Sequence, residues 1–388
     1  ICILYNHKHM INRYIHSILL CAFLVGMRAC GTPSRMDDYH HIIYSPTYAT
    51  GFRIMGAEGK QSTIIRVTNP WQTADHVETQ LFIARDGEKA PSGFSGQVLQ
   101  GDAKRVVCMS SSHIAMLDAI GAVGNVVGVS GKDFISNSHI VANRHAIADV
   151  GYDGNINFEL LVAQQPDIVL LYGVTGACSM QSKLDELGIP YIYIGEYVEE
   201  DPLGKTEWLV ALAEIVGCRQ AGLSYFSALP QRYEALRDMA AAATSSKPKV
   251  MLNTPYADSW FMPSVTSYMA RLIRDAGGDY IYQKNTSSHS LPIDMEEAAM
   301  LTVEADIWLH VEGVSSLQDL RNQYPRFANM PCVMRGAVYN NDRLREPGKG
   351  NDYWESGVVQ PDIVLRDLIR IFHPELLADE LVYYRKIE

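Results

Sequence analysis

The chain has 388 residues, of which 47% are hydrophobic and 20% are charged, a composition that is typical of globular proteins and excludes extended disorder. This length exceeds what one hydrophobic core usually supports, so we expect two lobes. The net charge is −11 and the basic residues are scattered along the chain, which argues against a nucleic-acid partner.

The N-terminal segment predicts secretion and attachment to a membrane. A short basic start at residues 10–16 precedes an apolar run over 17–27, which is too short to span a bilayer and is typical of a signal peptide. Cys30 follows this run and resembles the lipid-acceptor cysteine of a bacterial lipoprotein. We therefore expect a signal over 1–30 and a mature protein lipid-anchored in the periplasm or cell envelope. The alternative is a signal that is simply cleaved near Ala29.

The next segments predict a tether and then a small β-rich leader. Residues 31–45 are polar, so we expect them to be a flexible tether. Residues 46–103 contain short runs of β-branched and aromatic residues, separated by turn signals such as Asn69-Pro70. We expect this leader to pack on the first lobe.

Residues 104–202 alternate between strand and helix patterns, which predicts a parallel α/β lobe. The serines at 110–112 stand where they can cap the first helix. The expected strands are Arg105–Met109, Asn125–Val129, Asp167–Tyr172 and Tyr191–Ile194, and the expected helices are Ile114–Ile120, Phe158–Gln165 and Met180–Leu187.

Residues 203–246 break this alternation and predict connecting helices over Lys205–Val216 and Ala221–Ala243, the second kinked at Pro230. The strand and helix alternation then returns over 247–388, which predicts a second α/β lobe. The two lobes also share a sequence pattern. The segment from Glu159 to Asp167 and the segment from Glu297 to Asp306 each place an acid at a helix start and an aspartate before a strand.

The chain resembles the helical-backbone (class III) periplasmic binding proteins, in their lipoprotein form. The motifs that carry this resemblance are the strand, Ser-Ser-Ser-His and helix at 105–120, the Asn157–Val169 segment, the long connecting helix and the second lobe. These proteins are the substrate-binding components of ABC importers for ferric siderophores, heme and cobalamin. The resemblance implies two Rossmann-like α/β lobes that are joined by a long, rigid helix and hold a ligand between them.

The same resemblance implies partners and docking residues. The expected partners are an ABC permease with its ATPase, and a metal-chelate small molecule. By position, Glu159 and Glu297 carry over as the carboxylates that dock onto permease arginines, with Glu296 as a competitor of Glu297. The alternative interpretation is that these acids only complement helix dipoles.

Ligand-binding residues are expected in loops that follow the carboxyl ends of strands, where open α/β sheets form their crevice. Aromatic side chains there suit a flat or bulky ligand, and arginines suit its carboxylates or catecholates. Each candidate has the alternative of core packing, helix capping or solvation. The candidates are Ser111, Ser112, His113, Tyr172, Tyr256, Trp260, Arg343, Arg345, Tyr353 and Trp354.

The sequence contains none of the GxSxG, Walker A or HExxH motifs, so we expect neither an enzyme nor a resident cofactor. The histidines of the two lobes are isolated, and we expect no metal site. The predicted function is the capture of an iron complex (a ferric siderophore or heme) or cobalamin by a monomer that delivers it to a permease. The alternatives are a Zn²⁺ or Mn²⁺ receptor of the same superfamily and a lipid-anchored scaffold or adhesion protein.

Overall fold

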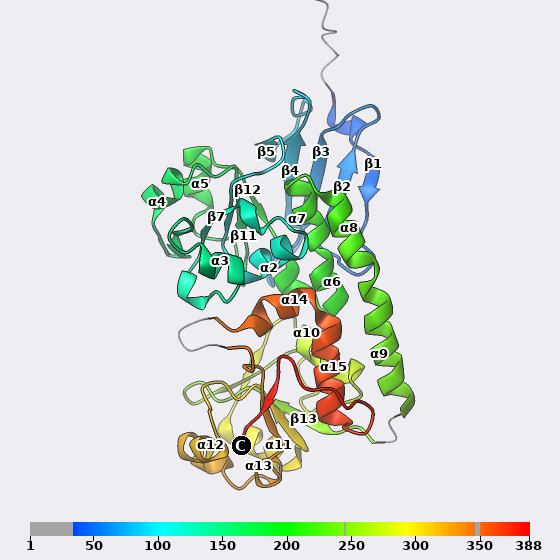
Figure 1. The fold of residues 1–388 in the computed structure, drawn as a ribbon, viewed down its shortest axis with the longest axis vertical. Helices are drawn as coiled ribbons and strands as arrows, with labels where there is room; N and C mark the ends of the chain where they lie inside the picture. The colour runs from blue at the N-terminus through cyan, green and yellow to red at the C-terminus, as the bar shows by residue number, and fades with distance from the viewer. Residues whose placement is uncertain (1–33, 244–245, 346–349) are drawn as a thin grey trace, which may run out of the picture.

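A computed structural model describes residues 34–243, 246–345 and 350–388, and it contains two α/β lobes stacked along the long axis of the molecule (Figure 1). The β-rich leader lies beside the upper, N-terminal lobe, and helix α9 (Leu229–Ala243) runs down the side of the C-terminal lobe. Cys30 and the predicted signal lie outside the described residues. Within these residues, no helix is long and apolar enough to cross a membrane.

The leader is a five-stranded sheet in the order β1-β2-β3-β4-β5, antiparallel except for the parallel pair β4 and β5. Its first strand lies in the segment predicted to be a tether, so that prediction is wrong for residues 41–44. The register of β1 on β2 and the burial of Tyr39 against Phe82 fix this segment in place. The strands are β1 (His41–Tyr44), β2 (Phe52–Gly56), β3 (Thr63–Thr68), β4 (Glu78–Ala84) and β5 (Gln97–Gln100).

The N-terminal lobe contains a parallel sheet in the order β12-β11-β6-β7-β8. Its strands are almost entirely apolar, because helices and the leader cover both faces. The strands are β6 (Val106–Cys108), β7 (Val126–Val129), β8 (Ala148–Asp149), β11 (Ile168–Leu171) and β12 (Tyr191–Tyr193). The helices are α2 (Ser111–Ala119), α3 (Ser138–Ala142), α4 (Phe158–Ala163) and α5 (Gln181–Leu187), and a small ribbon joins β9 (Gly151–Tyr152) to β10 (Asn155–Ile156).

The connecting segment contains four helices, α6 (Pro202–Glu207), α7 (Leu209–Ile215), α8 (Arg219–Ser227) and α9. The helical conformation is interrupted at Ala228, between α8 and α9. Pro230 lies in the first turn of α9, where a helix does not use the backbone N–H that proline lacks. Helix α9 packs on α15 (Pro361–Phe372) and so joins the C-terminal lobe to the connecting segment.

The C-terminal lobe has a sheet in the order β15-β13-β17-β18-β19, in which only β19 is antiparallel. Numbered in chain order, the strands of the N-terminal sheet lie in the order third, second, first, fourth, fifth, and those of the C-terminal sheet in the order second, first, third, fourth, fifth. Both lobes are parallel α/β units, and the predicted fold class is confirmed. The strands are β13 (Lys249–Leu252), β15 (Asp279–Tyr280), β17 (Ile307–Leu309), β18 (Val338–Asn340) and β19 (Arg385–Lys386), with a separate ribbon of β14 (Trp260–Met262) and β16 (Leu291–Ile293). The remaining helices are α10 (Tyr268–Asp275), α11 (Met295–Glu304), α12 (Leu317–Gln323), α13 (Pro331–Met334) and α14 (Ser356–Val359).

Buried carboxylates join the leader to the connecting helices. Glu207 accepts hydrogen bonds from the backbone N–H groups of Thr47, Tyr48 and Ala49 at 2.8–2.9 Å, and from the hydroxyl of Tyr44 at 2.6 Å. Four donors on one carboxylate satisfy the polar groups of this partly buried loop.

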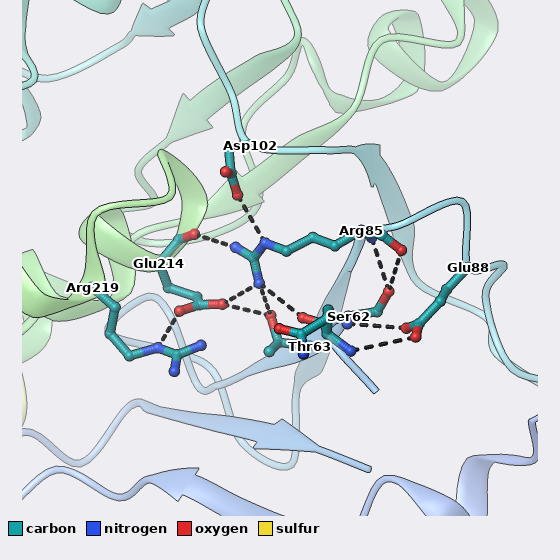
Figure 2. A network of polar contacts seen from close by, with 8 residues as sticks. Ser62, Thr63, Arg85, Glu88, Asp102, Glu214 and Arg219 are labelled. Carbon is teal, nitrogen blue, oxygen red and sulfur yellow. Dashed lines mark hydrogen bonds and ion pairs between the residues drawn. The ribbon is translucent and has the colours of Figure 1, made fainter. Parts of the chain in front are cut away.

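A second carboxylate, Glu214 of α7, lies at the centre of the polar network in Figure 2. Its Oε1 is 2.7 Å from Arg85 of the leader, which also binds Asp102 at 2.8 Å, and Arg219 approaches the other oxygen. Burial by itself would raise the pKa of Glu214, but the two guanidinium groups outweigh it and hold that pKa below its usual value. The leader is thus bound to the connecting helices through an ionic contact between Arg85 and Glu214.

The lobes also contact each other directly, through α14 of the C-terminal lobe, which packs on α2 and α6. The hydroxyl of Thr206 donates to the carbonyl of Val358 at 2.7 Å. Before α14, the buried carboxylate of Glu355 accepts hydrogen bonds from the backbone N–H of Ser136 at 3.0 and 3.1 Å. Glu355 therefore bridges the two lobes.

Candidate functional site

A cavity of about 340 Å³ lies between the two lobes, and we call it the cleft. The N-terminal lobe contributes Ser111 and Phe134, and the C-terminal lobe contributes the other lining residues. Gly350 allows the two backbones to approach at the edge of this cavity, because a Cβ there would overlap the carbonyl of Phe134. The lining residues are Ser111, Phe134, Glu312, Asn340, Asn341, Asp342, Arg345, Gly350, Asn351 and Trp354.

The serine run after β6 folds as a helix cap and leaves one serine facing the cleft. The hydroxyl of Ser110 accepts from the backbone N–H of Ser112, so Ser110 is the N-cap of α2 and Ser111 is its first residue. Ser112 is buried, and its hydroxyl donates to Glu196 at 2.5 Å. Ser111 is therefore the residue at the start of α2 that lines the cleft.

His113 is fully buried behind the cleft, next to Glu196, and does not line the cavity. Its Nε2 lies 3.6 Å from a carboxylate oxygen of Glu196, whose backbone carbonyl accepts from the ammonium of Lys205. Burial would raise the pKa of Glu196, but the His113 ring and the Lys205 ammonium outweigh it and lower that pKa. His113 is therefore a buried residue of the N-terminal lobe, which corrects its prediction as a ligand-binding residue.

The C-terminal wall is built on the carboxyl end of β18, where Asn340, Asn341 and Asp342 follow one another. Both oxygens of Asp342 are held by Arg385 of β19, at 2.6 and 3.0 Å. This ion pair neutralises Asp342 and fixes the loop that carries Arg345.

Trp354 supplies the aromatic part of this wall and is 46% exposed. Its ring packs edge-to-face against the ring of Tyr353, with 4.7 Å between the centroids. Tyr353 in turn packs against His310. Burial lowers the pKa of His310 to about 4, so this ring is neutral near pH 7. Tyr353 is a core residue that supports Trp354, which corrects its prediction as a wall residue.

The remaining predicted ligand residues lie away from the cleft. Trp260 is fully buried against Trp308 and Phe327, and its indole N–H donates to the carbonyl of Leu252. It is thus a core residue, and its prediction as a ligand residue is wrong.

Arg343 is also absent from the lining of the cleft, since its guanidinium binds Glu380 at 2.9 Å. Tyr172 is half-buried and Tyr256 is exposed on a turn, and neither lines the cavity. Of the ten predicted residues, the structure brings together Ser111, Arg345 and Trp354.

A model of the periplasmic binding protein family matches residues 106–343. The chain belongs to the periplasmic binding protein family. This finding confirms the predicted resemblance and gives the protein a solute-binding role. The matched segment covers the N-terminal lobe, the connecting helices and the C-terminal lobe up to the cleft loop, whereas the leader lies outside it.

Similar proteins of known sequence or structure agree with this assignment. An uncharacterized lipoprotein of Methanocaldococcus jannaschii is 27% identical over 344 residues, which cover 82% of this chain and 80% of that protein. A periplasmic heme-binding protein of Pseudomonas aeruginosa has a TM-score of 0.59 at 18% identity, covering 74% of this chain and 98% of the other. The heme-binding protein HutB of Vibrio cholerae has a TM-score of 0.53 at 17% identity, covering 67% and 98%. At these identities the solved structures show a shared fold.

The cleft of this periplasmic binding protein contains residues that the sequence interpretation missed. Asn340, Asn341 and Asp342 end a parallel strand, which is the signal that identified Ser111, but the predicted loop began at Arg343. Phe134 lies in a short 3-10 helix over 132–134, and its exposed ring gave no periodic signal. Among the described residues, no three histidines, cysteines or acids gather closely enough to hold a metal ion.

The leader also reaches the rim between the lobes. In the loop between β3 and β4, the N–H of Gln72 donates to the carbonyl of Val174 in the N-terminal lobe at 3.0 Å. The carbonyl of Gln72 accepts from the hydroxyl of Ser288 in the C-terminal lobe at 3.2 Å. One leader residue therefore connects the two lobes at a second place, apart from Glu355.

The two acids expected to dock differ in their surroundings. Glu159 is exposed at the second position of α4, after the N-cap Asn157. Glu296 has the same place in α11 after the N-cap Asp294 and is 74% exposed, whereas the side chain of Glu297 is 29% exposed and binds Lys284. The capping pattern thus pairs Glu159 with Glu296, although Glu296 also contacts Arg326 at 3.0 Å.

Proposed function

We propose that this protein is the substrate-binding component of an ABC importer, that it is not an enzyme, and that it captures a metal chelate in the cleft. The observation that carries the proposal is a cavity lined by residues from both lobes, with Ser111 and Phe134 on one side and Arg345 and Trp354 on the other. Exposed aromatic rings around a concave, partly polar surface are a common form of small-molecule site.

The connection between the lobes supports small movements on ligand binding. Helix α9 packs along α15, and α14 packs on α2 and α6, so the lobes share several contacts besides the chain itself. A receptor of this construction would hold its ligand mainly through preformed surfaces, with side-chain adjustments at the cleft. Release would then require a partner that separates the lobes.

A thermal-shift and absorbance screen of the full chain tests the proposal. The probes are hemin, cyanocobalamin, several ferric siderophores, and Zn²⁺ or Mn²⁺ alone. A bound chelate at a hundredfold over its Kd should stabilise the fold by about 2.7 kcal/mol. A response to Zn²⁺ or Mn²⁺ alone would favour a metal-ion receptor, and no response to any probe would contradict the proposal.

We further propose that Glu159 and Glu296 dock on arginines of the permease, since an exposed carboxylate can accept two parallel bonds from a guanidinium. The double variant Glu159→Arg with Glu296→Arg should bind ligand normally but abolish uptake by cells. A matched control changes Glu186 and Glu304, which are exposed on α5 and α11, to arginine and should leave uptake intact. Uptake that survives the first pair but fails with Glu297→Arg would move the docking role to Glu297.

Membrane attachment through Cys30 is the third part of the proposal. The relative in Methanocaldococcus jannaschii is named a lipoprotein, and Cys30 follows an apolar run. Cys30→Ser should move the protein from the membrane fraction to the soluble fraction of the cell envelope. An unchanged distribution would contradict lipidation at this residue.

A further inference from the structure

The leader contains a loop, residues 69–77 between β3 and β4, that we call the strap. Its two ends are joined within the leader, because the N–H of Asn69 donates to the carbonyl of Val77 at 2.9 Å and the N–H of Val77 donates to Oδ1 of Asn69 at 3.0 Å. Asn69 has a φ of 47°, a left-handed conformation that asparagine adopts more readily than most residues. The strap therefore has a fixed base, and it lies outside the segment that the family model matches.

Two hydrogen bonds join the strap to the N-terminal lobe, at the loop that follows β11. The N–H of Gln72 donates to the carbonyl of Val174 at 3.0 Å, and the hydroxyl of Thr73 donates to the carbonyl of Thr175 at 2.6 Å. The carboxyl end of β11 belongs to the edge at which open α/β sheets bind ligand, and Ser111 of the cleft follows the neighbouring strand β6. The strap therefore lies at the cleft edge of the N-terminal sheet.

Trp71 also holds the strap on this lobe. Its ring packs edge-to-face against the ring of Tyr193 in β12, with 5.2 Å between the centroids. Gly173 makes room for the indole, because a Cβ there would lie 3.1 Å from Cβ and Cε3 of Trp71. This aromatic contact adds the burial of apolar surface to the two hydrogen bonds.

On the C-terminal lobe, the strap meets the loop between β15 and β16, whose shape is fixed from inside. Asn285 is fully buried, its Nδ2 donates to the carbonyl of Met262 at 3.0 Å, and its Oδ1 accepts from the N–H of Ser287 at 2.9 Å. The next residue, Ser288, donates its hydroxyl to the carbonyl of Gln72 at 3.2 Å. The strap thus reaches a preformed surface of the second lobe.

The two attachments of the strap differ in strength. Ser288 is exposed, and within the described part of the chain its bond to Gln72 is the one hydrogen bond between the strap and the C-terminal lobe. A hydrogen bond of this kind changes an equilibrium by a factor of about 2 to 10. The N-terminal attachment combines two hydrogen bonds with the contact of Trp71. When the lobes part, the strap should therefore stay with the N-terminal lobe and separate from Ser288.

The leader can resist such a movement because it is fixed elsewhere as well. Arg85 binds Glu214 at 2.7 Å, and Glu207 accepts backbone N–H groups of the leader, so the leader is attached to the connecting helices. A shift of the C-terminal lobe away from the N-terminal lobe then moves Ser288 relative to the strap, and their hydrogen bond opposes the shift.

We propose that the strap restrains the opening of the cleft, so that the lobes part only when Ser288 separates from Gln72. This inference rests on the proposed function, in which the lobes must part to release ligand. It adds a restraint that the leader supplies, at the opposite side of the interface from no ligand group but from the chain itself, and that acts whether or not the cleft is occupied.

Hydrogen exchange of the full chain at one fixed pH tests the restraint without any ligand. The N–H of Ser136 reports the opening, because it donates to Glu355 across the two lobes. The N–H of His373 donates to the carbonyl of Ile369 within the C-terminal lobe and is the reference. Replacing residues 71–75 with two glycines removes the contacts of the strap but keeps its base. We expect this variant to exchange about tenfold faster at Ser136 and at an unchanged rate at His373.

A point variant on the other lobe keeps the test independent of the folding of the leader. Ser288→Ala removes the bond to Gln72 and should speed exchange at Ser136 about threefold. The matched control Ser290→Ala changes an exposed serine of the same loop, which makes no hydrogen bond within the described part of the chain, and should leave the rate unchanged.

The results separate this inference from the proposed function. Unchanged exchange at Ser136 in Ser288→Ala would overturn the restraint, and so would an equal increase at Ser136 and His373, which would indicate a general loss of stability. Either result would leave the proposed function in place, because that function is tested by the binding of ligand probes. If the shortened strap prevents folding, Ser288→Ala and its control decide the question.

Discussion

The two lobes share a scaffold but differ in what stabilises them. In both, an aspartate before the strand that pairs with the first strand (β11 beside β6, β17 beside β13) accepts backbone N–H groups at the start of that first strand. Asp167 accepts from Lys104 and Arg105 at 2.7 and 2.8 Å, and Asp306 accepts from Lys249 at 2.9 Å. Beyond this shared contact, the two halves differ. Buried carboxylates of the connecting helices bind the leader beside the N-terminal lobe, whereas the C-terminal lobe is filled by Trp260, Trp308 and Phe327.

This difference explains why the cleft draws its polar groups mainly from one lobe. In the N-terminal lobe, Ser112 and Glu196 bind each other, so Ser111 is the polar group of the helix start that lines the cavity. In the C-terminal lobe, the carboxyl end of β18 places Asn340, Asn341 and Asp342 in the cleft lining, while the aromatic core around Trp260 lies away from it. A duplicated fold can therefore divide structural and recognition roles between its halves.

The largest expected effect tests the aromatic core. Trp260→Ala should destabilise the protein by about 4 kcal/mol, since it removes a fully buried indole ring. Chemical denaturation measures this loss. Phe261→Ala, on the opposite and exposed face of the same strand, is the control and should cost less than about 0.5 kcal/mol. Equal stability of the two variants would contradict the core assignment.

The polar attachment of the leader to the connecting helices is the next target. Glu207→Ala leaves three backbone N–H groups and the Tyr44 hydroxyl without an acceptor, so we expect a loss of about 3 kcal/mol or more in the free energy of unfolding. Limited proteolysis should then cleave the leader faster than in the unchanged chain. Glu304→Ala, on the exposed face of α11, should leave both measurements nearly unchanged. If proteolysis cleaves the leader of Glu207→Ala no faster than that of the unchanged chain, the leader does not depend on this carboxylate for its attachment.

The contact between the lobes predicts a dependence on pH. Burial raises the pKa of Glu355 from 4.5 to about 7, with Asp352 adding to the shift, so the folded protein retains this proton more strongly than the unfolded chain does. The stability that this group contributes is fully present below pH 4.5 and is lost as the pH rises through about 7. The loss amounts to about 3 kcal/mol.

The variant Glu355→Gln isolates this dependence, because the amide oxygen can still accept from Ser136 but does not ionise. We expect the difference in unfolding free energy between the variant and the unchanged chain to move in favour of the variant between pH 4.5 and pH 8. Parallel pH profiles for the two proteins would show that Glu355 titrates normally and does not control this contact.

The smallest expected effect compares the two aspartates directly. Asp167 accepts two backbone N–H groups and Asp306 accepts one, so Asp167→Ala should cost roughly 1 kcal/mol more than Asp306→Ala. Denaturation midpoints of the two variants measure this difference. A larger loss for Asp306→Ala would mean that its contact with Arg335 outweighs the missing bond.

Much of the fold was predictable, because it depends on local patterns. The alternation after residue 104 and the serine cap before α2 each act over a few residues. The predicted single helix over Ala221–Ala243, kinked at Pro230, is instead two helices that meet at Ala228. The tether prediction failed at 41–44 because pairing with β2 orders a segment whose own composition is polar. Trp260 and Tyr353 were misassigned because an aromatic residue after a strand has the same local pattern whether it faces a cleft or a core.

The sequence by itself determined the two-lobed α/β class, the family resemblance and the acidic helix starts, since each rests on residue types at short spacing. The tertiary structure decided which of the candidate residues meet. Ser111, Phe134, Asn340 and Trp354 come from segments up to about 240 residues apart, and contacts between the lobes, such as the packing of α14 on α2, bring them around one cavity. It also decided which buried polar atoms are satisfied within the protein, because that depends on partners distant in the chain.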